Sequence, residues 1–458
     1  MSACYEDFLA GKAKVRPPAG LTRIPSLPSR LFGWQAKCVE WALRQGQAAL
    51  FEDCGLGKTC QQLAWADALV RERNVNALVL TPLAVAAQTV AEAETFGIEA
   101  AVSRDGKTQR GITVANYESL HKLTPGDYDA VVLDESSILK AYMGRTKQAL
   151  FEAFGSTPFR LAATATPAPN DLLELGNHSE FLGVLSSHEM IARWFLPDTS
   201  TMGTYRLKGH AVEHYWRWVS SWARCLGRPS DMGGSDAGYD LPPMEVHQHL
   251  AEVDIIGGRG EGQLFRQPDM SAANIHAEKR LTVRARAERL AELVCAEPDE
   301  PWVLWCDTDY EADALQEALP CALEVRGSMP LAMKEERLIG FTNGAFKVLI
   351  TKPKIAGFGL NWQHCARVGF VAPTYSYEAF YQASRRCHRF GQKRPVQVHV
   401  VMGSTEVDVW GVMMRKAAEH ETMKARMFDA MRANQSITDN TARAYDPRHI
   451  ASLPEWVK

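Results

Sequence analysis

The sequence lacks a cysteine framework and lacks long apolar runs. Its ten cysteines are scattered over 458 residues, and no two form a Cys-x-x-Cys pair. This pattern argues against a zinc ribbon and against structural disulfides, and it indicates a reducing compartment. No apolar run reaches the length of a membrane span, and no N-terminal basic stretch leads into an apolar core. We therefore expect no membrane association, no export and a location in the cytoplasm.

The sequence also has little net charge. Its 51 Lys and Arg residues nearly balance its 54 Asp and Glu residues, which gives a net charge of −3. Any contact with nucleic acid must therefore come from local basic patches. The hydrophobic content of 46% is that of an ordinary globular protein, and the length suits two domains with insertions rather than one core.

A strand, a glycine loop and a helix start are indicated at residues 48–59. An apolar run precedes the loop, and the loop ends in Lys58 and Thr59, where helical spacing of apolar residues begins. Glycines let backbone N–H groups surround phosphate oxygens, a lysine can reach the β- and γ-phosphates, and a threonine hydroxyl can bind Mg²⁺. The full pattern begins with a glycine where this sequence has Glu52, so only its shorter half is matched.

Further β-like runs alternate with helical segments downstream. They lie at residues 77–80, 112–115, 130–133 and 160–163. This alternation predicts a parallel sheet with crossover helices, in which ligands bind beyond the carboxyl ends of the strands. Polar residues stand at these ends, namely Thr81, Asn116, Asp134, Glu135, Thr164 and Thr166.

The pair Asp134 and Glu135 is the second strong signal. An acid at the end of a buried strand can hold hydrated Mg²⁺, and an adjacent acid can deprotonate a water that attacks the γ-phosphate. Most Asp-Glu pairs are solvated turns, but the preceding strand and the upstream loop favour the functional interpretation. Thr164 and Thr166 either relay between nucleotide and nucleic acid or cap a turn before Pro167. Gln35, on a helix just upstream, either pairs with adenine or is a solvated helix residue.

The middle of the chain changes character. Residues 171–223 are helical and rich in tryptophan, which predicts a helical insertion whose tryptophans form a small apolar core rather than a base-stacking platform. Residues 226–262 are rich in Gly and Pro and are predicted to be a hinge between domains.

A second α/β half follows without a phosphate loop. Its β-like runs lie at residues 302–306, 347–350, 368–371 and 396–401. Arg386 and Arg389 are three residues apart and so share a helix face, from which they could reach across a cleft to the γ-phosphate. The alternative is a solvated or nucleic-acid-facing surface. Residues 417–431 predict an amphipathic helix that either closes the second domain or docks a partner.

Together these segments resemble superfamily 2 helicases, and within them the Snf2-like ATPases. The resemblance runs from about residue 31 to residue 408. Residues 53–59 are similar to the first motif of that family, which itself lacks the leading glycine. Three further motifs of the family have counterparts here: its Mg²⁺ and water motif at 133–135, its third motif at 161–170 and its arginine-finger motif at 382–392. Two shorter segments, at 392–396 and 405–406, are also similar to the family.

The resemblance implies an α/β fold with two RecA-like parallel-sheet domains and a helical insertion. The implied division is a lead-in at 1–30, a first domain at 31–178, an insertion at 179–225, a hinge at 226–262, a second domain at 263–412, and a C-terminal helix and tail at 413–458. The implied cofactors are ATP and Mg²⁺.

The resemblance also implies roles for single residues. Nucleotide binding would fall to Gln35, Asp53, Cys54, Gly55, Leu56, Gly57, Lys58 and Thr59, with Gln35 on adenine, Lys58 on phosphate, and Thr59 and Asp134 on Mg²⁺. Catalysis would fall to Glu135 as general base, to Lys58, to Arg386 and Arg389 as fingers, and to Gln382 near the γ-phosphate. A nucleic-acid track would be lined by Thr81, Asn116, Thr164, Gly357, Gly359 and Asn361.

The implied function is ATP-driven translocation along double-stranded DNA. The alternatives are a strand-separating DNA or RNA helicase, for which single-stranded DNA or RNA would be the partner, and a motor subunit of a restriction or anti-restriction assembly with replication or restriction proteins as partners. A scaffold with a dead ATPase is disfavoured because Lys58, Asp134, Glu135, Arg386 and Arg389 are all present.

Two features depart from the family pattern. Ser136 and Ser137 replace the usual Ala-His, which puts the coupling of hydrolysis to the track in question. The Arg-rich stretch of many relatives is reduced here to Arg224 and Arg228. The absence of an added chromatin-reading or nuclease domain favours a compact bacterial or phage version, which would place a phage protein in the host cytoplasm.

Overall fold

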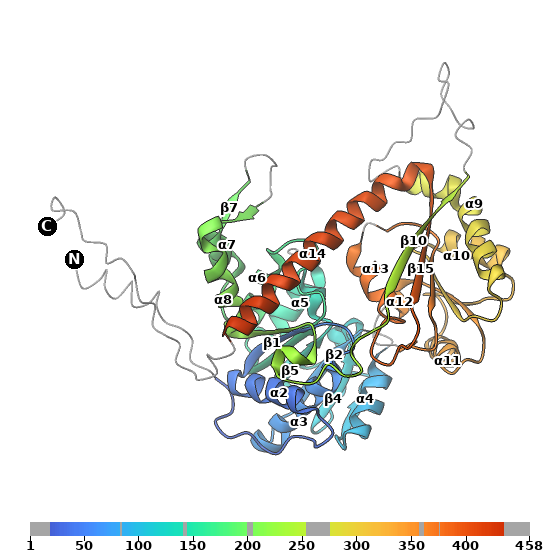
Figure 1. Ribbon diagram of the computed structural model, residues 1–458. Coiled ribbons are helices and arrows are strands. Elements are labelled where there is room, and N and C mark those ends of the chain that lie inside the picture. Colours follow the sequence, from blue (N-terminus) through green and yellow to red (C-terminus); the bar gives the residue numbers. More distant parts are fainter. Residues whose placement is uncertain are drawn as a thin grey trace, which may run out of the picture.

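The computed structural model describes residues 19–82, 85–140, 144–198, 205–252, 275–356, 361–374 and 376–434. Within these ranges, two parallel β-sheets form two lobes, and a short antiparallel pair lies apart from both (Figure 1). The predicted α/β fold with two parallel-sheet domains is confirmed. No helix of the described residues is both long enough and apolar enough to cross a membrane.

The first lobe is built on a seven-stranded sheet of order β3-β4-β2-β5-β6-β1-β9. Its strands are β1 (Gln47–Glu52), β2 (Ala77–Thr81), β3 (Ala100–Val102), β4 (Ile112–Asn116), β5 (Ala130–Asp134), β6 (Phe159–Thr164) and β9 (Ala223–Leu226). Its helices are α2 (Gly33–Gln45), α3 (Lys58–Arg73), α4 (Ala86–Thr95) and α5 (Arg145–Phe154). Alternate strand residues pack on either face: Leu50 and Val79 lie against α2 and α3, whereas Leu78 and Leu133 lie on the side of α5. Both faces are covered, which explains the continuous apolar runs.

The insertion consists of α6 (Glu174–Phe181), α7 (Ser187–Trp194), β7 (Phe195–Pro197), β8 (Tyr205–Leu207) and α8 (Val212–Trp222). Trp216 and Trp222 are buried in the first lobe's core, which confirms the apolar interpretation for these two side chains. The predicted insertion at 179–225 differs from the structure at both ends, because α6 already begins at Glu174 and β9 pairs with β1 as the last strand of the first sheet. The strand was missed because it is short and contains Arg224, whose guanidinium lies 4.0 Å from the centre of the Trp41 ring.

The second lobe is built on a six-stranded sheet of order β10-β15-β14-β11-β13-β12. Its strands are β10 (Met244–Ala251), β11 (Trp302–Trp305), β12 (Leu323–Val325), β13 (Val348–Thr351), β14 (Arg367–Phe370) and β15 (Val396–Gly403). Its helices are α9 (Ile275–Ala296), α10 (Asp309–Ala318), α11 (Leu331–Thr342), α12 (Pro353–Ala356) and α13 (Tyr377–Ser384). The predicted hinge at 226–262 differs from the structure, because β10 lies inside it and pairs with β15 along its whole length. The glycines and prolines before β10 concealed an edge strand of alternating polar and apolar residues.

Helix α14 (Val407–Asn434) starts earlier than the predicted boundary at 413 and runs from the second lobe to the first (Figure 1). Trp410 and Met413 pack in the second lobe. Met427 and Met431 pack into the two cores of the first lobe. The predicted helix at 417–431 is confirmed, but it joins the lobes instead of only closing the second domain.

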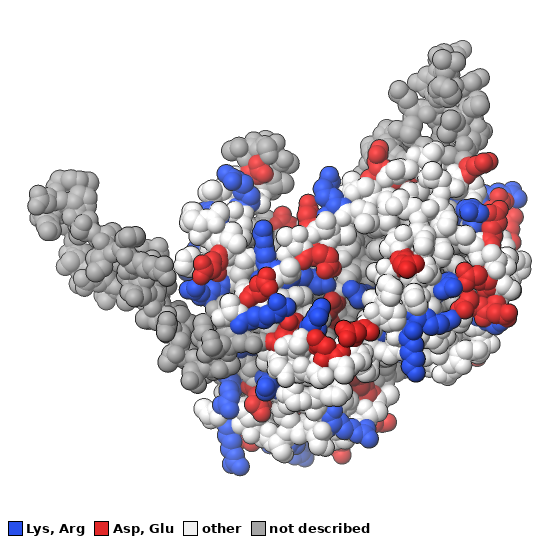
Figure 2. All heavy atoms as spheres, viewed as in Figure 1, with Lys and Arg blue, Asp and Glu red and all other residues white. Residues whose placement is uncertain are grey.

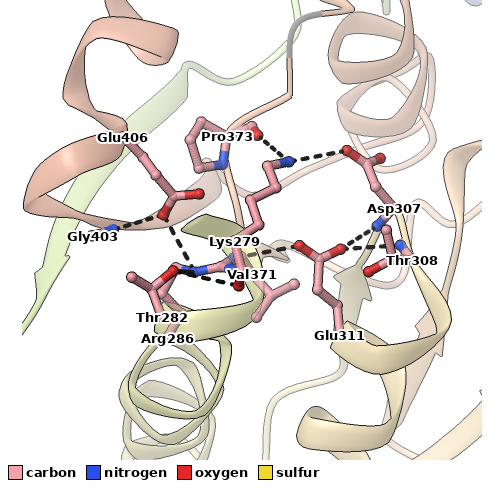
Figure 3. Close-up of polar contacts among 10 residues, drawn as sticks. All are labelled: Lys279, Thr282, Arg286, Asp307, Thr308, Glu311, Val371, Pro373, Gly403 and Glu406. Atoms are coloured by element: carbon pink, nitrogen blue, oxygen red, sulfur yellow. Dashed lines mark hydrogen bonds and ion pairs between the residues drawn. The ribbon is translucent and has the colours of Figure 1, made fainter. Parts of the chain in front are cut away.

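A buried ionic network anchors the start of α14 (Figure 3). Arg286 of α9 is fully buried, 3.5 Å from Glu311 and 3.3 Å from Glu406, which directly precedes the helix. Glu406 also accepts a hydrogen bond from the Gly403 amide at 2.9 Å. A buried charge is costly unless it is paired and hydrogen-bonded, so these partners hold the strand-to-helix junction to α9.

Candidate nucleotide site between the lobes

The phosphate loop lies between β1 and α3 and depends on its two glycines. Gly55 and Gly57 have φ angles of 89° and 77°, in the left-handed region that favours glycine. A Cβ atom on Gly55 would lie 3.2 Å from the backbone nitrogen of Phe390 in the second lobe, and one on Gly57 would lie 2.6 Å from Gln35 Nε2. The loop therefore needs glycine for its conformation and for the close approach of both neighbours.

Lys58 is the first residue of α3, so it lies where the helix N-terminus favours anions. Its Nζ atom donates to the carbonyl oxygens of Glu52 and Asp53, at 2.9 and 3.1 Å. These contacts keep the ammonium group at the loop, and Thr59 follows in the same first turn. A glycine cradle with a lysine and a hydroxyl at its end fits a nucleotide phosphate with Mg²⁺.

Gln35 is buried, so the solvated-helix interpretation is wrong. Its Nε2 donates to the Leu56 carbonyl at 2.9 Å, and its Oε1 accepts from the Phe32 amide at 3.0 Å. The side chain thus supports the phosphate loop directly. Its contact with adenine stays a prediction.

Asp134 and Glu135 lie at the carboxyl end of β5, on the same edge of the first-lobe sheet as the phosphate loop. Asp134 accepts from Gln62 Nε2 at 2.7 Å, and its carbonyl accepts from the Tyr117 hydroxyl at 2.7 Å. Glu135 has a φ of 53°, a strained conformation of the kind that clusters at functional sites. The burial of Glu135, and then the charge of Asp134, raise the pKa of Glu135 to about 7. A carboxyl group with a pKa near neutrality suits a general base.

Residues of both lobes converge on Glu135. Its Oε2 atom is 3.4 Å from Thr164 Oγ1 of the first lobe and 3.4 Å from Gln382 Nε2 of the second. Gln382 also donates to Thr166 Oγ1 at 3.3 Å. The Glu135 carboxylate therefore lies in the cleft between the two lobes, and its contact with Gln382 depends on closure of that cleft.

The two arginines of the predicted finger motif lie at the same cleft. Arg386 is buried, and its Nε donates to the Gln382 carbonyl at 3.2 Å. Burial raises the pKa of both Asp134 and Glu135, and the charge of Arg386 opposes this rise. Burial, and then the charge of Arg386, lower the pKa of Arg389 to about 10, so that Arg389 is still a cation at neutral pH. Both guanidinium groups thus bring positive charge to the cleft.

The predicted track residues divide into three groups. Thr81 and Thr164 are fully buried at the ends of β2 and β6, so they expose no surface in this arrangement of the lobes. Asn116, at the end of β4, and Asn361 are partly exposed. Gly357 and Gly359 lie outside the described residues. The track stays a prediction.

Several polar residues of the site were not singled out from the sequence. Gln62 holds Asp134, and Tyr381, Arg385 and Lys424 gather around Asp53. The position of Gln62 one helical turn after the phosphate loop is a signal that could have been used, whereas the distant Lys424 offered none.

The Ser136-Ser137 departure also has a structural counterpart. Ser136 Oγ lies 3.1 Å from Nε2 of His178, a fully buried histidine on α6. Burial lowers the pKa of His178 to about 4, so this ring is neutral. The segment after Glu135 is therefore tied to a histidine of the insertion.

A cleft of 320 Å³ opens beside the phosphate loop. Its walls come from the loop, from the segment between β9 and β10, and from the residues that follow α13. Asp53, Leu56, Tyr239, Arg385, His388 and Phe390 are among the lining residues. The cleft thus joins both lobes at the loop.

Comparisons with known proteins agree with this architecture. Residues 285–391 match the family described as helicase conserved C-terminal domain. The chromodomain-helicase-DNA-binding protein 1-like of Mus musculus is 30% identical over 482 residues, covering 87% of this chain and 49% of that protein. An uncharacterized ATP-dependent helicase of Mycoplasma pneumoniae is 22% identical over 454 residues, covering 89% of this chain and 43% of that protein. The chain therefore spans about half the length of the curated relatives it matches.

Among solved structures, the chain is similar to a Sulfolobus solfataricus SWI2/SNF2 ATPase core in complex with dsDNA. The sequence identity is 18%, the TM-score is 0.42, and the match covers 91% of this chain and 97% of that one.

Proposed function

We propose that this chain, a Snf2-like member of helicase superfamily 2, hydrolyses ATP between its lobes and thereby moves along double-stranded DNA. The observation that carries the proposal is the convergence on Glu135 of Thr164 from one lobe and Gln382 from the other. A base held by both lobes is fully assembled only when the cleft is closed, which makes hydrolysis depend on lobe position.

The chemistry assigns a task to each group. The phosphate loop and Lys58 would hold the β- and γ-phosphates, and Thr59 and Asp134 would hold Mg²⁺, which would neutralise phosphate charge. Glu135 would take a proton from the attacking water, and Gln382 would orient this carboxylate. Arg386 and Arg389 would stabilise charge that develops on the transferred phosphoryl group.

Movement along DNA would come from the change in distance between the two lobes. Contacts to backbone phosphates require no base reading, so we expect weak sequence preference and binding that weakens steeply with salt. Acidic and basic side chains are interspersed on the face shown in Figure 2, so contacts there would rest on single side chains rather than on a broad field. The names of the relatives, a DNA-binding helicase and an ATP-dependent helicase, support DNA and ATP as ligands.

Displacement of a third strand from a DNA triplex tests the proposal. A translocase is expected to remove the third strand from blunt duplex DNA when ATP is present, and to leave a forked duplex paired. The Glu135→Gln variant is the control for contaminating motors. Unwinding of the fork without triplex displacement would support the alternative of a strand-separating helicase and would contradict the proposal.

A further inference from the structure

Helix α14 carries a lysine into the phosphate loop. Lys424 Nζ lies 3.0 Å from Asp53 Oδ2 and 3.3 Å from the Tyr381 hydroxyl, with 7% of the Lys424 side chain exposed. Asp53 accepts a hydrogen bond from the Cys54 amide at 2.7 Å inside the loop, and a second one from the Tyr381 hydroxyl. The conformation of the loop is therefore tied to α13 and α14 of the second half of the chain.

The groups around Asp53 stabilise its ionised form. Burial opposes ionisation of Asp53, but the cations Arg385 and Lys424 and the hydrogen bonds from Tyr381 and Lys424 hold the pKa of this carboxyl below its usual value. Asp53 is thus a carboxylate at neutral pH. Phosphates bound in the adjacent loop would be repelled by this charge if it were not neutralised.

The other groups near Lys424 do not replace Asp53 as its partner. Glu421 lies 3.2 Å away, one turn earlier on α14, but it is largely exposed to solvent. An exposed ion pair of this kind contributes little. His420 is buried between Tyr377 and Tyr381, and burial lowers its pKa to about 4, so it carries no charge at neutral pH.

The position of Lys424 is set by both lobes. The start of α14 is held in the second lobe through Glu406 and Arg286 (Figure 3). Its end is held on the first lobe, where Met431 is buried and Arg432 Nε lies 3.0 Å from Asp231. Lys424 lies between these two anchors, so a shift of one lobe relative to the other must bend α14 or strain the contact with Asp53.

We propose that Lys424 is a positioning residue for the nucleotide site: it neutralises and holds Asp53, so that the seating of α14 over the cleft sets the affinity of the phosphate loop for ATP. The inference rests on the proposed function, because it requires a nucleotide in this loop. It also means that any change in the position of α14, even one caused outside the cleft, would change the affinity for the nucleotide.

Titration of the full-length protein with a fluorescent ATP analogue tests this inference. Lys424→Met is expected to weaken binding about tenfold, because the Asp53 carboxylate keeps Arg385 nearby but loses the ammonium group that is ion-paired with it beside the phosphates. In the Asp53→Asn background, the same Lys424→Met change is expected to alter affinity less than about threefold, since no carboxylate remains to be neutralised. The matched control is Arg426→Met, which removes an exposed cation from the same helix and is expected to leave affinity unchanged.

Two outcomes would overturn the inference. The first is unchanged affinity in Lys424→Met. The second is an equal loss in the native and Asp53→Asn backgrounds, which would mean that Lys424 serves only the packing of the helix. Lys424→Gln gives the same comparison if the Met variant does not fold. Failure of the unaltered protein to bind the analogue would instead contradict the proposed function, so the two failures are distinguishable.

Steady-state kinetics supply a second readout. A residue that positions the ground-state site is expected to raise KM for ATP when it is replaced, with little change in kcat. A fall in kcat at constant KM would contradict the inference.

Discussion

Glu135→Gln is expected to abolish ATP turnover and to leave nucleotide binding intact. The amide has the shape of the carboxylate but cannot take a proton from water, and loss of a general base costs on the order of 10²–10⁴ in rate. Burial, and then the charge of Asp134, raise the pKa of Glu135 to about 7, which suits a group that takes up a proton near neutral pH. Steady-state hydrolysis and titration with a fluorescent ATP analogue measure the two effects separately.

Two further variants make the Glu135 result specific. Lys58→Ala is expected to weaken nucleotide binding itself, because it removes the cation of the phosphate loop. Glu40→Gln, which changes an exposed glutamate on α2, is expected to behave like the unaltered protein. Hydrolysis by Glu135→Gln at the unaltered rate would show that another group is the base.

Arg386→Gln is expected to lower kcat about 10³-fold and to change nucleotide affinity less than about threefold. An arginine finger acts on charge that develops in the transition state, so its loss appears mainly in turnover. Arg386 belongs to the second lobe, and its Nε atom donates a hydrogen bond to the backbone carbonyl of Gln382. The side chain of Gln382 in turn contacts Glu135. Single-turnover hydrolysis and equilibrium binding are the measurements.

The matched control for Arg386 is Arg415→Gln, which removes an exposed arginine of α14. It is expected to leave both kcat and affinity unchanged. Equal losses of turnover and affinity in Arg386→Gln would indicate that Arg386 binds the ground state, and the finger assignment would be wrong.

Much of the fold follows from local patterns in the sequence. Four of the predicted strands form where predicted, at residues 77–80, 112–115, 130–133 and 160–163. Mainly apolar runs suit a sheet that is covered on both faces, and polar residues begin where each strand leaves the sheet. For this reason the apolar run at 130–133 is enough to predict that Asp134 and Glu135 lie at a strand end.

The remaining elements depend on tertiary contacts that no local pattern contains. Strand β9 accommodates Arg224 because Trp41 covers the guanidinium and the Ser220 carbonyl accepts a hydrogen bond from it. Strand β10 is an edge strand with several polar residues, and it follows a run of glycines and prolines that indicates a linker. Lys424 and Asp53 are 371 residues apart in sequence, and the course of α14 across both lobes brings them together.

ATP hydrolysis at steady state, measured without nucleic acid and with double-stranded DNA, single-stranded DNA or single-stranded RNA, tests the central claim most directly. Glu135→Gln serves as the control for contaminating ATPases. We expect weak hydrolysis by the protein alone and strong stimulation chiefly by double-stranded DNA. Stimulation chiefly by single strands, or by none of the nucleic acids, would contradict it.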